Sequence, residues 1–256
     1  MNIFDIPLYY ISFKENEKLK SKLELAGFKN INHFEAIDGR KFQPAELLSK
    51  KLITIRTYTD LISDREQHSG IPSLGAVGCT MSHDKLWNLC VDKNFPYIII
   101  VEDDMTSLNL NNDNVGKIQK ILSRPNSVFV GTKVRKKNPS KDIKSTQFMG
   151  LQFYIVSNEA CKELVKSTFP IDVQTDWYMA HLDTIDKLNV NGIPLASQTV
   201  HNSSIQDVCV KCFLPNKTIY YIILAVVLLG LLIWRIILMK KLKLCNANLI
   251  KIKGKK

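Results

Sequence analysis

The amino-acid sequence predicts an α/β protein, with a mostly parallel sheet flanked by helices and followed by one C-terminal transmembrane helix. Strand-like and helix-like segments alternate along residues 6–200, a pattern typical of parallel sheets because each crossover needs a connecting helix. An amphipathic helical pattern at residues 75–94 leads into an apolar run at residues 97–101. Near the C-terminus, residues 218–239 form an apolar stretch of about the 20 residues that span a bilayer.

Each element has its own local signal. Apolar runs predict strands, apolar residues spaced three or four apart predict helices, and Gly or Asp-Gly marks turns. We expect strands at residues 6–13, 30–37, 97–101, 127–132 and 148–157, and one or two short strands within residues 188–200. Helices are expected at residues 15–28, 44–52, 75–94, 115–122 and 158–168. The polar segment 106–114 and the charged segment 133–145 are expected to be exposed loops.

The charge of the chain is concentrated at its C-terminus. The formal net charge is +11, from 35 basic and 24 acidic residues. Without Arg235 and the seven lysines from Lys240 onward, 27 basic residues stand against the same 24 acidic ones. The part upstream is therefore only mildly basic, and it lacks the aromatic residues interleaved with basic ones that a nucleic-acid platform needs. Nucleic acid is not an expected partner.

The apolar stretch divides the chain into four expected parts. These are a folded domain at residues 1–208, a juxtamembrane linker at 209–217, a transmembrane helix at 218–239 and a basic tail at 240–256. The prediction is a single-pass membrane protein with a C-terminal anchor. Its orientation stays open, because the basic tail favours the cytosolic side, whereas the absence of a signal peptide favours a cytosolic folded domain.

The cysteines suggest no metal centre by their spacing. Cys79, Cys90 and Cys161 fall within predicted helices and are interpreted as small core residues. The C-x-x-C pair at residues 209–212 has no second pair, so a local disulfide or a solvated pair is expected instead of a zinc knuckle. Cys79 and His83 are spaced as two ligands on one helix face, but the sequence offers them no further partner, so zinc is not expected there.

Three acidic residues follow the apolar run at residues 97–101. In an open α/β sheet, ligands bind beyond the carboxyl ends of the strands, which is where Glu102, Asp103 and Asp104 should lie. Clustered carboxylates repel one another unless a proton or cation neutralises them, and carboxylate oxygens favour magnesium, manganese or calcium over zinc. A metal site that takes substrate phosphates is one interpretation; a solvated turn after a strand is the other.

The same region resembles the signature of glycosyltransferase family 25, the lipooligosaccharide and procollagen galactosyltransferases. In "GAVGCTMSHDKLWNLCVDKNFPYIIIVEDDM", a Gly-Cys segment, a Ser-His pair, an apolar helix and a strand ending in Glu-Asp-Asp occur in the family's order. Four further segments are similar to family motifs, and together they cover residues 6–206: "YYISFKENEKLKSKLELAGFKNINHFEAIDG", "GLQFYIVSNEACKEL", "FPIDVQTDWYM" and "PLASQTVHNSSI".

The resemblance implies a GT-A type fold that transfers a hexose, galactose or glucose, from a nucleotide-sugar donor such as a UDP-hexose. It implies a divalent cation, manganese, held by Glu102 and Asp104, which stabilises the leaving diphosphate. Inversion at the sugar needs a general base, for which Asp172 matches the Pro-x-Asp position and Asp176 lies one turn further on. The residues implied at the donor are Ser12, Lys18, Ser82, His83, Asp103 and Gln198.

The opening motif departs from the family pattern. The family has Asn-Leu and then two arginines, whereas this chain has Ser12 in place of the Asn, and Lys18 or Lys20 must replace an arginine. Lysine keeps the charge but loses the bidentate contact with phosphate. Two alternatives stay open: an inactive, glycosyltransferase-like membrane scaffold, which this departure favours, and a metal-dependent phosphoryl-transfer enzyme that uses the same acids. The acceptor, a hydroxyl on a glycan, protein or lipid, is not specified.

Overall fold

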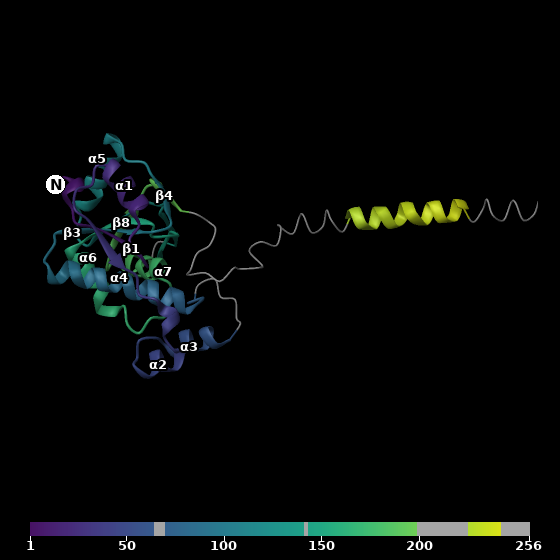
Figure 1. Ribbon diagram of the computed structural model, residues 1–256, viewed down its shortest axis with the longest axis horizontal. Coiled ribbons are helices and arrows are strands. Elements are labelled where there is room, and N and C mark those ends of the chain that lie inside the picture. Colours follow the sequence, from purple (N-terminus) through teal and green to yellow (C-terminus); the bar gives the residue numbers. More distant parts are fainter. Residues whose placement is uncertain (64–69, 141–142, 199–224, 242–256) are drawn as a thin grey trace, which may run out of the picture. The chain divides into compact units, whose positions relative to one another are not determined.

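The computed structural model describes residues 1–63, 70–140, 143–198 and 225–241. The chain divides into two compact units, Met1–Asp207 and Val208–Lys256. The first carries the sheet, and the second contains a helix at residues 225–241 (Figure 1). The predicted linker at 209–217, its C-x-x-C pair and the first residues of the predicted membrane span, 218–224, lie outside the described residues.

A six-stranded sheet forms the centre of the first unit, in the order β2-β1-β3-β8-β5-β9. Five strands run parallel, and only β8 is antiparallel to its neighbours β3 and β5. The predicted mostly parallel α/β sheet is thus confirmed. The strands are β1 (Leu8–Ser12), β2 (Ile31–Glu35), β3 (Tyr97–Glu102), β5 (Ser127–Val130), β8 (Phe153–Ser157) and β9 (Asn189–Gly192).

Helices pack on both faces of this sheet (Figure 1). Ile98 and Ile100 of β3 point to one face, which α4, α6 and α7 cover, whereas Ile99 and Val101 point to the face covered by α1 and α5. This alternation explains why the run is continuously apolar: a central strand is buried on both sides. The helices are α1 (Glu17–Leu25), α2 (Pro44–Ser49), α3 (Ile55–Ile62), α4 (Leu74–Asp92), α5 (Asn112–Leu122), α6 (Asn158–Ser167) and α7 (Thr175–Thr184), with short 3-10 turns at η1 (Ile3–Asp5) and η2 (Gly39–Lys41).

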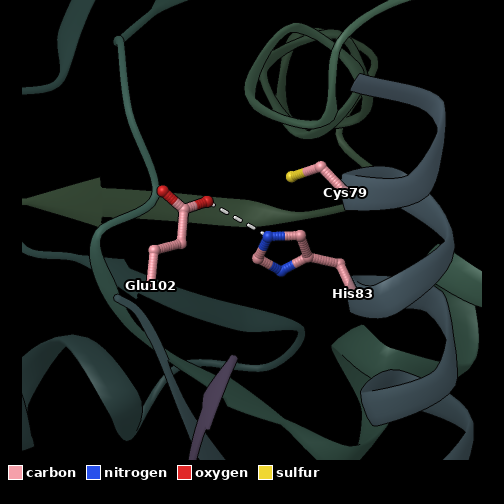
Figure 2. A group of neighbouring side chains, drawn as sticks. All are labelled: Cys79, His83 and Glu102. Atoms are coloured by element: carbon pink, nitrogen blue, oxygen red, sulfur yellow. Dashed lines mark hydrogen bonds and ion pairs between the residues drawn. The ribbon is translucent and has the colours of Figure 1, made fainter. Parts of the chain in front are cut away.

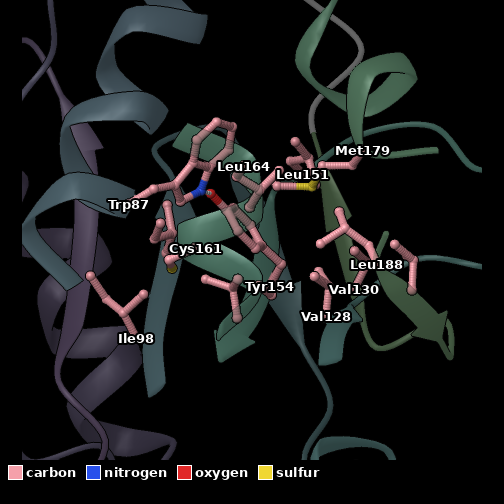
Figure 3. Packing of buried hydrophobic residues seen from close by; sticks show 14 of the residues in the cluster. Trp87, Ile98, Val128, Val130, Leu151, Tyr154, Cys161, Leu164, Met179 and Leu188 are labelled. Atoms are coloured by element: carbon pink, nitrogen blue, oxygen red, sulfur yellow. Dashed lines mark hydrogen bonds between the residues drawn. The ribbon is translucent and has the colours of Figure 1, made fainter. Parts of the chain in front are cut away.

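The core beside α4 is built around two aromatic residues (Figure 3). Trp87 of α4 and Tyr154 of β8 are both fully buried, and the Trp87 Nε1–H donates to the Tyr154 hydroxyl over 2.9 Å. Cys161 of α6 packs in the same cluster and Cys90 of α4 is equally buried, as expected from the sequence. Cys79, in contrast, is only partly buried.

The charged segment 133–145 is not a loop, as the sequence suggested, but part of a hairpin. β6 (Arg135–Ser140) pairs antiparallel with β7 (Ile143–Gln147). The reason is a distant partner: Asp183 of α7 is fully buried and lies 3.3 Å from Lys136 Nζ and 3.6 Å from Lys144 Nζ, and Thr146 Oγ1 donates to it. The hairpin lysines thus compensate a buried carboxylate on α7.

The polar segment 106–114 also contains a strand. β4 (Met105–Leu108) pairs antiparallel with β10 (Ala196–Gln198) in a separate two-stranded sheet. The sequence did not predict this strand, because two of its four residues are exposed and the strand with which it pairs lies about 90 residues away.

The predicted transmembrane helix is contradicted. Within the described ranges, no helix is both long and apolar enough to span a membrane. For the part of the chain that the structure describes, this finding contradicts the predicted span at residues 218–239 and the predicted single-pass membrane localisation.

Candidate functional site

A pocket of about 160 Å³ opens at the carboxyl ends of β1, β2 and β3. β1 and β3 are parallel neighbours in which Ile11 pairs with Glu102, so the residues that follow both strands meet at one sheet edge. This is the edge where open α/β sheets bind ligands. The pocket is lined by Ile11, Ser12, Phe13, Ala36, Ile37, Arg40, Gly75, Cys79, Ser82, His83, Glu102, Asp103 and Asp104.

The three predicted acids all line this pocket. Glu102 ends β3, and Asp103 and Asp104 form the tight turn into β4. Burial, reinforced by the charges of Glu102 and Asp103, raises the pKa of Asp104 to about 7. Asp104 Oδ1 is buried and has no hydrogen-bond partner among the described residues. A buried carboxylate oxygen without a partner is costly, and a bound cation would compensate it.

His83 connects the acids to the core. It is fully buried on α4, with Nε2 3.1 Å from Glu102 Oε1 and Nδ1 2.8 Å from the Tyr154 hydroxyl. Because the Trp87 indole can only donate, the Tyr154 oxygen accepts from it over 2.9 Å. A continuous series of hydrogen-bond contacts therefore runs from the buried Trp87 through Tyr154 and His83 to Glu102. Through it, the hydrophobic core fixes the position of one carboxylate that was predicted to bind a metal.

The loop after β2 lies directly on the backbone of α4. A Cβ at Gly78 would lie 2.3 Å from the Ile37 carbonyl oxygen, and one at Gly39 would lie 1.8 Å from the Leu74 carbonyl oxygen. Ser82 Oγ accepts from the Ile37 N–H over 2.9 Å and donates to the Gly78 carbonyl over 2.8 Å. The Gly-Cys and Ser-His motifs thus have a structural role: two glycines permit the contact, and Ser82 fixes it.

Arg40 is the pocket residue that the sequence interpretation missed. It lies in η2, with its guanidinium 2.7 Å from Asp38 Oδ1 and 5.2 Å above the ring centroid of the partly exposed Phe13. Both Arg40 and Phe13 line the pocket. The Asp38-Gly39 turn was visible in the sequence as a turn signal, but nothing local indicated that the next residue lines the pocket.

The predicted donor residues divide into two groups. Ser12, Ser82, His83 and Asp103 line the pocket, although the Ser12 hydroxyl donates to the Lys14 carbonyl over 2.6 Å. Lys18 is exposed on α1 and is not among the lining residues. Gln198 ends β10, and its backbone pairs with Met105, the residue after the acids.

The two predicted bases have different surroundings. Asp172 accepts a 2.5 Å hydrogen bond from Thr54 Oγ1 and lies 3.5 Å from Arg56 Nη1, with its side chain 41% exposed. Asp176, in the first turn of α7, accepts from the N–H groups of Gly150 and Trp177. Burial raises the pKa of Asp176, those backbone donors lower it, and the charge of Glu102 raises it further. Asp176 is thus coupled electrostatically to Glu102 of the pocket.

Comparisons with known proteins identify the family of this chain. The family model described as "Glycosyltransferase family 25 (LPS biosynthesis protein)" matches residues 6–179. The chain is 28% identical over 102 residues to "Glycosyltransferase 25 family member" of Drosophila melanogaster, covering 38% of this chain and 16% of that protein. It is 29% identical over 118 residues to "Lipooligosaccharide biosynthesis protein lex-1" of Haemophilus influenzae, covering 39% of each.

The match thus spans well under half the length of these relatives. Among solved structures, the crystal structure of A197 from STIV aligns with a TM-score of 0.43 and 11% identity over 77% of this chain and 86% of that chain, a likeness from which we conclude nothing. The family match covers more than half of the sequence and includes every residue that lines the pocket. The chain belongs to glycosyltransferase family 25.

Proposed function

We propose that this chain is a metal-dependent, inverting glycosyltransferase. It would transfer a hexose, galactose or glucose, from a UDP-hexose to a hydroxyl of a glycan, protein or lipid acceptor. Family membership supports sugar transfer. The observation that carries the metal-dependent mechanism is Asp104 Oδ1, a buried oxygen without a described hydrogen-bond partner in a pocket lined by two further carboxylates.

Glu102 and Asp104 are the proposed ligands of a hard divalent cation, manganese. Their carboxylate oxygens are the ligand type that such cations prefer, and one or two carboxylates suffice when donor phosphates complete the shell. When bound, the cation stabilises the negative charge that develops on the leaving diphosphate. His83 holds Glu102 in place through the 3.1 Å contact, and Asp103 contributes to the negative field.

Arg40 is the proposed cationic contact for the donor diphosphate. Its guanidinium lines the same pocket as the acids, and arginine binds phosphate through paired hydrogen bonds. It would replace the arginines that the opening motif lacks, in place of the exposed Lys18. The phosphate would compete with Asp38 for this guanidinium.

Asp176 is the proposed general base, ahead of Asp172. A base must accept the proton of the acceptor hydroxyl as that oxygen attacks the sugar carbon, and its pKa must lie above that of a solvated carboxylate to do so efficiently. Burial raises the pKa of Asp176, whereas the carboxylate of Asp172 is engaged by Thr54 and Arg56.

The test measures UDP release and UDP binding separately. Wild-type protein with manganese should bind UDP in calorimetry and release it from at least one UDP-hexose. Asp104→Asn should weaken manganese and UDP binding together, and Asp176→Asn should reduce turnover by about 10²- to 10⁴-fold while UDP still binds. Asp113→Asn is the matched control, because Asp113 is an exposed acid paired with Lys117 on α5.

The same experiment tests the inactive-scaffold alternative. A chain that binds neither manganese nor UDP, and that releases no nucleotide from any common UDP-hexose, would refute the enzymatic proposal. Equal turnover in wild-type protein and Asp104→Asn would refute the assigned metal ligands.

A further inference from the structure

Three side chains of different chemistry converge on the inner wall of the pocket (Figure 2). Cys79 and His83 lie one turn apart on the same face of α4, and Glu102 reaches them from the end of β3. The Sγ, imidazole nitrogen and carboxylate oxygen all lie within 4.8 Å of one another. The sequence alone showed only the first two residues; the fold supplies the third.

The donor set favours a softer cation than the acidic trio does. A thiolate and an imidazole suit zinc, and three protein ligands with one open position are typical of exchangeable zinc sites. Zinc bonds of about 2.0–2.3 Å place tetrahedral ligand atoms about 3.5 Å apart. The His83 Nε2–Glu102 Oε1 distance is 3.1 Å, and all three ligand atoms lie within 4.8 Å of one another. Side-chain adjustments of Cys79 and Glu102 on the order of 1 Å would bring them to tetrahedral spacing.

The surroundings of His83 hold it in a ligand's orientation. Metal-binding histidines usually donate their second ring N–H to a fixed oxygen, and Nδ1 of His83 lies 2.8 Å from the Tyr154 hydroxyl. In the metal-free chain the Nε2 proton faces Glu102; on zinc binding the ring proton would reside on Nδ1, where the Tyr154 oxygen can accept it, and the Nε2 lone pair would face the ion. His83 is fully buried and fixed by this contact, so little side-chain entropy is lost on binding.

We propose that Cys79, His83 and Glu102 form a zinc site, with its fourth position open to the pocket. Binding replaces the Cys79 S–H proton, which leaves to solvent, by a zinc–thiolate bond. Because Glu102 is shared with the manganese ligands proposed above, zinc and manganese compete for this carboxylate. The competition rests on the proposed function, whereas zinc binding itself does not. Zinc would therefore act as an inhibitor of manganese-dependent transfer.

The first experiment titrates the full, metal-free chain with cobalt(II) as a spectroscopic substitute for zinc. The wild-type chain should show a sulfur-to-cobalt charge-transfer band, and zinc should displace cobalt. Cys79→Ser should lose the band and weaken zinc binding by at least about 100-fold, beyond the 10- to 100-fold typical of losing an outer-shell partner. Cys79→Ala serves the same purpose should the serine variant not fold.

Two control variants show which residues produce the sulfur-to-cobalt charge-transfer band. The double variant Cys209→Ser/Cys212→Ser removes the other closely spaced cysteines and should keep the band and the affinity. Asp104→Asn should lose manganese binding but keep zinc. A band that survives Cys79→Ser, or that disappears in the double variant, would overturn the zinc site.

The second experiment measures manganese binding by the electron paramagnetic resonance of free manganese(II), with and without one equivalent of zinc. Zinc should weaken manganese binding at least tenfold in the wild-type chain and have no such effect in Cys79→Ser. Undiminished manganese binding beside bound zinc would overturn the sharing of Glu102. A chain that binds zinc through Cys79 but binds no manganese at all would refute the proposed function and leave the zinc site standing.

Discussion

The pH dependence of manganese binding is the most direct measure of the acidic trio. Burial and the charges of Glu102 and Asp103 raise the pKa of Asp104 to about 7, and a metal ligand must be ionised. With that pKa, about 90% of the Asp104 carboxyls are ionised at pH 8 and about 10% at pH 6. Manganese affinity should therefore fall about tenfold between pH 8 and pH 6, a difference of about 1.4 kcal/mol.

Calorimetric titration of manganese at pH 6, 7 and 8 checks this. Asp104→Asn should bind more weakly at every pH and show a much flatter profile, since its amide does not titrate. A wild-type profile that is flat over this range, or an Asn variant with the same tenfold drop, would refute the assignment of the titration to Asp104.

The same group links stability to pH in the metal-free protein. The folded-state pKa of about 7 lies above the ordinary value of 3.8, so between these values the folded chain holds a proton that the unfolded chain has lost. Stability should therefore fall as pH rises from about 4 to about 7. Urea unfolding at pH 5 and 7.5 should show a smaller decrease for Asp104→Asn; an equal decrease in both proteins would contradict this explanation.

Three further predictions concern the walls of the site and its supports. Asp183→Ala should cost about 2–6 kcal/mol of unfolding free energy in urea, because it leaves the buried Val190 N–H and Thr146 hydroxyl without their acceptor, at about 1–3 kcal/mol each; a cost below 1 kcal/mol would contradict this. Gly78→Ala should cost about 1–3 kcal/mol through its backbone overlap, whereas Gly116→Ala, with open space around it, should stabilise α5 by about 0.4–1 kcal/mol. Arg40→Ala should weaken UDP binding at least tenfold in calorimetry, as expected for a charge-assisted contact, and unchanged affinity would exclude the phosphate contact.

Local sequence patterns predicted the sheet well where each element carries its own signal. β3 is apolar on both faces, and the amphipathic helix before it begins after Ser73, whose hydroxyl accepts from the Ala76 N–H. Such signals depend only on neighbouring residues. The acids at the end of β3 were predicted to lie at the ligand-binding edge for the same reason, and they line the pocket there.

The features that the sequence did not predict depend on residues that lie far apart in the chain. The hairpin of residues 135–147 depends on Asp183, a residue far along the chain. Arg40 enters the pocket because glycines on two separate segments allow a loop to lie on α4. The proposed zinc site could not be predicted from the sequence either, because its third donor, Glu102, is brought to Cys79 and His83 only by the fold.

The loop after β2 and helix α4 contact each other through their main-chain atoms, so the width of the pocket does not depend on the side chains that line it. Main-chain atoms at Gly39, Gly78 and Ile37 set the distance between the two walls, so the exposed Phe13 side chain does not determine that distance. Under the proposed function, exchanging Phe13 should alter which nucleotide sugar binds while the distance between the walls stays the same. Ile37 is less suitable for exchange, because its side chain packs against the core cluster beside α2 and α4.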